Sequence, residues 1–196
     1  MTGRPMTSLS AAYFEALYAA DPDPWKFLTS DYEAAKYATT LEALREEPYE
    51  HGLEVGCSIG VLTGMLVPHC RRLTAVDSSA RAVAAARRHC GLVPSLSIQR
   101  REVPGQWPNG RYDLILLSEV VYYWDERDLA QVASLVRRDL MPGGDVLLVH
   151  WIGNTDYPLS GDAAVEAFIQ HAAGVLQPVR QDRYPEYRLD LLRREA

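Results

Sequence analysis

Cysteine is scarce in this chain, which has three: Cys57, Cys70 and Cys90. Their number is odd and their spacing includes no CxxC pair, so a disulfide framework and a zinc site are both disfavoured. No apolar run approaches the ~18 residues that a membrane-spanning helix needs, and residues 1–10 lack the apolar core of an export signal. We therefore expect a cytoplasmic protein with no metal site and no membrane partner.

Basic residues are also few: the chain has 20 Lys and Arg and 26 Asp and Glu, which gives a formal net charge of −6. Phosphate backbones are bound by basic surfaces, so we expect no nucleic-acid partner. Repeats and low-complexity linkers are absent, and 47% of the residues are apolar, which argues against disorder. A length of 196 residues suits one domain. We predict a single domain over residues 1–196, with a lead over 1–50 and a body over 51–196.

The body alternates between strand and helix patterns. Strands are predicted at about 52–56, 72–77, 96–100, 112–117 and 145–150, and helices at about 60–67, 79–90, 126–139 and 162–173. Such alternation is typical of βαβ units, and thus of a mostly parallel sheet covered by helices. Two last strands, at about 175–182 and 187–192, are joined by so few residues that they must pair antiparallel. The predicted fold class is α/β, a Rossmann-like doubly wound sheet ending in an antiparallel hairpin.

The lead combines a proline-rich turn with one helix. Ser30 and Glu33 have the spacing of a capping box, and the helix that they begin carries Tyr37 and ends before Pro48. Trp25 and Phe27 precede it and add apolar surface. We predict that this helical lead folds over a ligand site as a lid.

A glycine turn between the first two strands of the body is the most informative motif. Gly56 and Gly60 let the backbone approach a ligand closely, and Asp77, which ends the second strand, can accept hydrogen bonds from both ribose hydroxyls. Glu54 would repel a pyrophosphate at this turn. Ser58 replaces the middle glycine of a G-x-G-x-x-G pattern, and its third glycine is missing. A cationic nucleoside, S-adenosylmethionine, therefore fits the turn better than a dinucleotide.

Other polar residues are expected around the same crevice, since ligands bind outside the carboxyl ends of parallel strands. Asp77 could alternatively form a helix N-cap that it shares with Ser78 and Ser79. Glu102 either accepts from an adenine amino group or is a solvated loop acid, and Val103 follows it. Ser118, at the end of an apolar strand, must face water or ligand.

The acceptor side of the crevice is expected to follow the fourth and fifth strands of the body. Glu119 either acts on the substrate or caps the next helix. Tyr122, Tyr123 and Trp124 cannot all face inward from one segment, so at least one should line the crevice. His150 either serves as a general base near neutral pH or merely closes its strand. Trp151 and Asp156 follow it at the mouth of the site.

Several motifs together resemble those of S-adenosylmethionine-dependent methyltransferases: residues 55–60, 74–77, 112–123 and 140–144. Asp23-Pro24-Trp25, Glu33, residues 68–74 and residues 118–123 resemble more narrowly the nodulation protein S family, which methylates the free amine of a deacetylated chitin oligosaccharide. The resemblance implies that Glu54 and Gly56 hold the amino-acid end of the cofactor and that Asp77 binds its ribose. It also implies that Glu102 and the Val103 amide contact the adenine, and that the Ser118 carbonyl lies near the ammonium group. It also implies that Trp25 and Tyr37 close over the cofactor.

The sulfonium of that cofactor is itself a strong electrophile, so the protein must mainly position an acceptor and take its proton. Glu119, His150 and Asp156 are the candidates for the proton acceptor, and Tyr122, Tyr123 and Trp151 could stack on sugar faces. The substrate is then a small molecule, with an amino sugar or oligosaccharide expected.

Three alternatives remain open at this point. The first is O-methylation of another small molecule. The second is a nicotinamide-dependent oxidoreductase, against which Glu54 and the missing YxxxK pair both argue. The third is a cofactor-binding subunit without an acceptor site.

Overall fold

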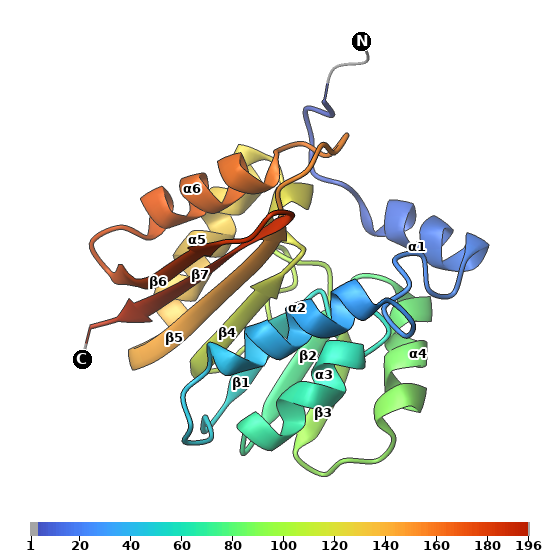
Figure 1. The fold of residues 1–196 in the computed structure, drawn as a ribbon, viewed down its shortest axis with the longest axis horizontal. Helices are drawn as coiled ribbons and strands as arrows, with labels where there is room; N and C mark the ends of the chain where they lie inside the picture. The colour runs from blue at the N-terminus through green and yellow to red at the C-terminus, as the bar shows by residue number, and fades with distance from the viewer. Residues whose placement is uncertain (1–3, 196) are drawn as a thin grey trace. The chain divides into compact units, whose positions relative to one another are not determined.

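The computed structural model describes residues 4–195, which form two compact units (Figure 1). One comprises residues 10–102, and the other comprises residues 4–9 together with residues 103–195. The single-domain interpretation of residues 1–196 stays a prediction.

The unit of residues 10–102 is built on three parallel strands in the order β3-β2-β1. Its elements are α1 (Ala11–Ala20), α2 (Asp31–Glu42), β1 (Gly52–Val55), α3 (Val61–Leu66), the 3₁₀ turn η1 (Val67–His69), β2 (Leu73–Asp77), α4 (Ala80–Cys90) and β3 (Leu96–Arg100). Val55 pairs with Val76, so β1 and β2 end at the same edge. The glycine turn and Asp77 therefore lie together there.

Helix α1 was not predicted from the sequence, which assigned one helix to the lead. Glu15 is the one charged or strongly polar residue of this helix, so no polar face contrasts with its apolar residues and the periodicity that reveals a helix is weak. The signals that could have revealed it are the alanines and the N-cap serine: Ser10 accepts a hydrogen bond from the Tyr13 amide. The predicted capping box is confirmed at its serine, because Ser30 Oγ accepts from the Glu33 amide at 3.2 Å.

The second unit contains four strands in the order β4-β5-β7-β6. Its elements are β4 (Tyr112–Ser118), the 3₁₀ turn η2 (Val121–Tyr123), α5 (Glu126–Asp139), β5 (Leu140–Trp151), α6 (Gly161–Ala172), β6 (Leu176–Arg183) and β7 (Tyr187–Arg194). β4 and β5 are parallel, whereas β7 is antiparallel to both β5 and β6. The predicted C-terminal hairpin is thus confirmed.

Strand β5 begins earlier than the predicted residue 145. Tyr112 of β4 pairs with Leu140, but Leu114 pairs with Asp145, so residues 141–144 bulge out of the ladder. Gly143 has φ of 72° within this bulge, a conformation that glycine adopts without strain. The predicted Pro-Gly-Gly turn is therefore an interruption of β5 and does not precede it.

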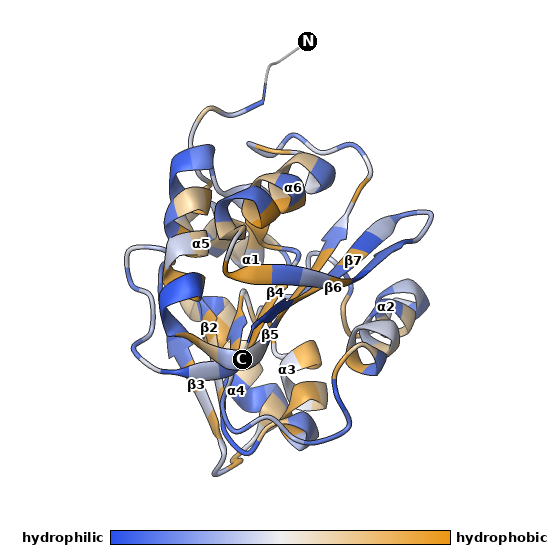
Figure 2. Ribbon diagram, turned by 90° about the vertical axis from the view of Figure 1, so that its left-hand side faces the viewer, coloured by the Kyte–Doolittle hydropathy of each residue, from blue (hydrophilic) through white to orange (hydrophobic). Residues whose placement is uncertain are grey.

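Apolar and polar residues alternate along several helices, as their mixed colours in Figure 2 show. α4 buries Ala82, Val83 and Ala86. α5 buries Leu129, Val132, Ala133 and Val136 and lies beside α6 (Figure 1). Within residues 4–195, none of the helices combines the length and the apolar character needed to cross a membrane.

Candidate functional site

The turn after β1 has a left-handed backbone at three positions. φ is 81° at Gly56, 50° at Ser58 and 88° at Gly60. The amides of Gly56 and Cys57 both donate to the Val76 carbonyl, at 2.8 and 3.0 Å. These bonds hold the turn against the end of β2, and glycine relieves the strain at two of the three positions.

Gly60 is also required by packing. A Cβ at this position would lie 2.9 Å from both Cα and Cβ of Ala86 and 3.1 Å from Sγ of Cys90. Because the backbone of α4 blocks that space, any side chain at Gly60 would force α3 away from α4. Gly60 therefore fixes the direction in which α3 leaves the turn.

Asp77 connects the turn to the end of β2. Its Oδ2 accepts from the Ser58 amide at 2.9 Å, and its Oδ1 accepts from the Ser79 amide at 2.8 Å. Burial raises the pKa of Asp77 to about 6, although these backbone hydrogen bonds oppose the shift. The N-cap of α4 is the side chain of Ser79, which accepts from the Ala82 amide. Of the alternative N-cap that Asp77 would share with Ser78 and Ser79, the structure thus shows Ser79 as the capping side chain, with Asp77 as the acceptor of its amide.

Glu54 is a buried carboxyl group whose hydrogen-bond partner is neutral. It is 3% exposed, and Thr63 Oγ1 donates to its Oε2 at 2.6 Å. Burial raises the pKa of Glu54 to about 7, and the negative charge of Asp77 adds to the increase. A cationic ligand at the turn would offset both effects. The two acids and the glycine backbone therefore suit a ligand that carries an ammonium group and a ribose.

Helix α1 is attached to this turn by two hydrogen bonds that the sequence did not suggest. The hydroxyls of Tyr18 and Ser58 lie 2.5 Å apart, and Ser79 Oγ donates to Glu15 Oε2 at 2.7 Å. Tyr18 also packs with Ile59 and Ala82 in a buried cluster. Glu15, Tyr18 and Thr63 are thus site residues that sequence reasoning missed. No motif marks them, because their partners are far away in the sequence.

The aromatic residues of the lead form a continuous row beside the turn. Trp25 lies 5.7 Å from Tyr18 and 5.7 Å from Phe27, measured between ring centroids. Phe27 is 6.1 Å from Tyr37, which is buried. The structure therefore brings the predicted residues Trp25 and Tyr37 into one aromatic row, whose member Tyr18 is bonded to the glycine turn.

Glu102 has a structural partner in the same unit. It is an exposed residue, and its Oε1 accepts from the Ala11 amide at the start of α1, at 3.3 Å. Ser78 is partly buried, and its carbonyl accepts from Arg100 Nε. The geometry favours a helix-end role for Glu102, while its contact with adenine stays a prediction. The roles of Val103 and Ser118, which lie in the second unit, also stay predictions.

Glu119 lies directly after β4 with φ of 55°. Its amide donates to the Val149 carbonyl at 2.8 Å, and its Oε2 accepts from the Trp151 amide at 3.0 Å and from the Tyr122 hydroxyl. Burial and the Glu119 charge hold the pKa of Tyr122 well above its usual range, so this hydroxyl stays protonated. Helix α5 is capped by Asp125, so the alternative that Glu119 caps the next helix is wrong.

His150 is fully buried beneath the 3₁₀ turn η2. Its Nε2 accepts from the amides of Val120 at 3.2 Å and of Val121 at 3.1 Å, which assigns the ring proton of the neutral imidazole to Nδ1. Proton uptake at Nε2 would break both bonds. This geometry favours the structural alternative for His150 over the predicted general base.

The three consecutive aromatic residues Tyr122, Tyr123 and Trp124 are all buried, at 4%, 8% and 5% exposed. The prediction that they cannot all face inward is wrong. The 3₁₀ turn ends at Tyr123 and Trp124 is extended, so successive side chains leave the backbone in different directions. Tyr157 covers the two tyrosines, with ring centroids 5.1 and 4.7 Å away.

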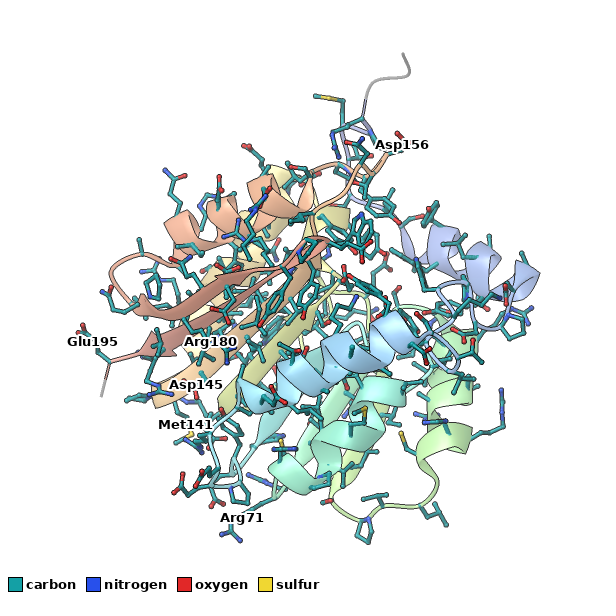
Figure 3. The ribbon with its side chains drawn as sticks, in the orientation of Figure 1. Arg71, Met141, Asp145, Asp156, Arg180 and Glu195 are labelled. Carbon is teal, nitrogen blue, oxygen red and sulfur yellow. The ribbon has the colours of Figure 1, made fainter. Side chains whose placement is uncertain are left out.

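Asp156 is an exposed residue of the loop between β5 and α6. Figure 3 shows this loop far from Met141 and Asp145, which lie near the start of β5. The loop thus lies beyond the carboxyl end of β5, and the role of Asp156 as a proton acceptor stays a prediction.

Comparison with known families identifies one matching family model, Nodulation protein S (NodS), over residues 14–145. Nodulation protein S of Rhizobium tropici is 34% identical over 131 residues, which cover 66% of this chain and 55% of the relative. The chain thus spans about half the length of the curated relatives that it matches first.

Two solved structures have similar folds. The N-methyltransferase NodS of Bradyrhizobium japonicum WM9, in complex with S-adenosyl-L-homocysteine, gives a TM-score of 0.80 at 22% identity, covering 96% of this chain and 100% of that one. A putative methyltransferase from Pseudomonas syringae gives 0.72 at 34% identity, covering 83% and 99%. The predicted fold class, that of class I methyltransferases, is confirmed.

Proposed function

This chain belongs to the nodulation protein S family, and we propose that it is an S-adenosylmethionine-dependent methyltransferase. The observation that carries the proposal is the pair of acids at the glycine turn. Glu54 is buried with only a neutral hydroxyl as its described hydrogen-bond partner, and Asp77 stands at the end of the adjacent strand. That arrangement suits a ligand with a cationic end and a ribose, and it disfavours a pyrophosphate.

Each part of the cofactor has a proposed set of partners. Glu54 and the Gly56 backbone would hold its amino-acid end, and Asp77 would accept from its ribose. Its adenine is assigned to Glu102 and Val103, and its ammonium also to the Ser118 carbonyl. Trp25 and Tyr37 would cover it. The left-handed backbone at Gly56 supports this assignment, because glycine lets a ligand approach the backbone closely there.

The bound cofactor supplies an electrophilic methyl group. The residues of this chain have to orient the acceptor, exclude water and receive a proton. Orientation alone can lower a barrier by about 7–11 kcal/mol in the best cases. This order of magnitude makes positioning the main task of the protein, ahead of acid–base chemistry.

We propose that the acceptor is the free amine of a deacetylated amino sugar or oligosaccharide. Such an amine resembles an α-amino group with a pKa near 8, so much of it is protonated at pH 7. Glu119 is the proposed group that attracts the cation and takes its proton. Its carboxylate is oriented by the Tyr122 hydroxyl and the Trp151 amide. The ring of Trp151, which is partly exposed, adds apolar surface beside it. Tyr122 and Tyr123 are buried beneath Tyr157, so the predicted stacking of these two rings on a sugar is not supported.

The cofactor assignment is tested by titration calorimetry with S-adenosylhomocysteine and with NAD. We expect saturable binding of the first and none of the second. Asp77→Ala should weaken binding by roughly 1–3 kcal/mol, because the ribose hydroxyls lose their acceptor. Binding of NAD alone would instead support the oxidoreductase.

The acceptor assignment is tested with labelled cofactor and glucosamine oligomers, beside fully N-acetylated oligomers. We expect label in the deacetylated oligomers only. Equal labelling of both would point to a hydroxyl acceptor. If neither is labelled by a protein that binds the cofactor, the amino-sugar assignment fails, and another small molecule or a non-catalytic role remains.

A further inference from the structure

Helix α2 buries a polar face and exposes its alanines. The residues that it buries lie three or four positions apart and so share one side of the helix: Glu33, Lys36, Tyr37 and Thr40. Three alanines of the same helix, Ala34, Ala35 and Ala38, are exposed. Helix α4, by contrast, buries alanine and valine. Such a departure from the usual pattern is expected where a face serves ligand binding as well as packing.

Lys36 and Glu33 form a buried ion pair on this face. Lys36 is 2% exposed and Glu33 is 8% exposed, and Lys36 Nζ lies 3.0 Å from both Oε1 and Oε2 of Glu33. The same ammonium group lies 5.1 Å from the centroid of the Tyr32 ring. The desolvation of two charges offsets most of their mutual attraction, so a buried pair is weak evidence for stability. A role in ligand binding accounts better for its burial.

The polar face of α2 is connected to the glycine turn by two routes within residues 10–102. Helix α2 lies beside α3 (Figure 1), and Thr63 of α3 donates to Glu54. Tyr37, which follows Lys36, belongs to the aromatic row whose member Tyr18 is bonded to the turn. Lys36 therefore shares its side of α2 with a residue that we assign to cover the cofactor.

The amino-acid end of the proposed cofactor carries a carboxylate as well as an ammonium group. Glu54 and Asp77 suit the ammonium and the ribose, but they would repel the carboxylate, so a cation is needed to offset them. Of the lysines and arginines in residues 10–102, all of which the structure describes, only Lys36 is buried. An ammonium group has three donors, so Lys36 can hold Glu33 and a ligand carboxylate at the same time.

We propose that Lys36 binds the carboxylate of S-adenosylmethionine, and that Glu33 is a positioning residue that holds the Lys36 ammonium group in place for it. The inference rests on the proposed function and deepens it, because recognition of the cofactor then depends on both charges of its amino-acid end. Glu54 selects ligands with an ammonium group, and Lys36 selects those with a carboxylate. Nucleosides that lack the carboxylate are therefore bound more weakly.

The test compares S-adenosylhomocysteine with its decarboxylated analogue, which keeps the amine, by titration calorimetry. The wild type should bind S-adenosylhomocysteine about ten- to a hundredfold more tightly, the effect expected of one hydrogen bond between charged groups. Lys36→Met should remove most of this preference and leave the Kd of the analogue unchanged, whereas a purely structural loss would weaken both ligands equally. Lys26→Met is the matched control, because Lys26 is an exposed lysine of the same lead, paired with Asp21.

Lys36→Met leaves the Glu33 charge buried without this cation, so a double variant, Glu33→Gln with Lys36→Met, is measured as well. It removes both charges together and should lose the same preference for the carboxylate. Glu33→Gln alone should reduce the preference less, because the cation stays. Equal binding of the two ligands by the wild type would overturn the inference and leave the cofactor assignment intact, and so would an undiminished preference in the double variant. If the wild type binds neither ligand, the proposed function is the part that is wrong.

Discussion

Glu54 is a carboxyl group whose charged form is disfavoured by its surroundings in the fold. Burial and the neighbouring Asp77 both disfavour its charged form, and the single hydrogen bond from Thr63 offsets only part of the effect. A buried charge of this kind is stabilised when a ligand of opposite sign arrives. We therefore expect that binding of the proposed cofactor would stabilise the charged form of Glu54.

The affinity for S-adenosylhomocysteine is expected to depend on pH through Glu54. The pKa of Glu54 in the free protein is about 7, and a bound ammonium favours the carboxylate. The Kd should therefore fall as pH rises from about 5.5 to 7, by up to about tenfold per unit, and level off above this range. Calorimetry across this range measures the effect.

The matched variant for this measurement is Glu54→Gln, which should flatten most of the pH dependence. A smaller slope should remain near pH 6, where Asp77 titrates. An equally steep dependence in Glu54→Gln would show that another group controls binding.

Glu119 and His150 are expected to respond differently to substitution. His150→Ala leaves the buried amides of Val120 and Val121 without their acceptor, at a cost of about 1–3 kcal/mol each. It should lower the free energy of unfolding and spare the kcat of the folded fraction. Glu119→Gln should lower kcat by about 10²–10⁴ with little change in Tm. Denaturant titration and steady-state assays of both variants separate the two roles, and the reverse pattern would return His150 to catalysis.

Helix α1 is the element that connects the lead to the glycine turn. Glu15 is bonded to Ser79 and Tyr18 to Ser58, and the neighbours of α1 in the lead are the aromatic residues around Trp25. Ser79 and Ser58 both donate their amides to Asp77, so a shift of the turn on ligand binding would change the contacts of α1.

We expect hydrogen exchange across residues 11–40 to slow when S-adenosylhomocysteine is added. Tyr18→Phe removes one hydroxyl bond, of about 0.5–1.5 kcal/mol, and should speed exchange in α1. Tyr13→Phe, the same change at a residue that is 40% exposed on the same helix, is the control. Equal exchange with and without ligand would make the lead a packed structural arm.

The protein as a whole should be stabilised by its cofactor through mass action. A ligand at 100 times its Kd adds about 2.7 kcal/mol to the folded state, which corresponds to roughly 5–10 °C in Tm for a chain of this size. Thermal melts with S-adenosylhomocysteine should show this shift. The same melts with NAD should show no shift, and those of Asp77→Ala should show a smaller shift than the wild type. A shift with NAD alone would contradict the cofactor assignment.

The sequence alone located most strands and helices, because hydrophobic periodicity and turn residues act over a few positions. The strand at 96–100 and the helix at 126–139 match the structure at both ends. The sequence also located the two acids and the glycine of the turn. Glu54, Gly56 and Asp77 belong to consecutive elements of one strand–helix–strand unit, so their positions can be inferred from a short stretch of sequence. Helix α1 was not predicted because nearly all of its residues are apolar, which leaves no polar face to mark the period. The bulge at 141–144 was predicted as a turn because bulges and turns both use proline and glycine.

What only the tertiary structure decided is which partner each polar side chain has. Ser79 and Glu15 are 64 residues apart, and His150 accepts from amides 29 and 30 positions earlier. Such pairings depend on how distant segments pack, and no local propensity encodes them. The sequence therefore determined the chemical character of the cofactor turn. Packing decided that α1 is bonded to that turn, that His150 supports η2 and that Glu119 is left as the carboxylate between Tyr122 and Trp151.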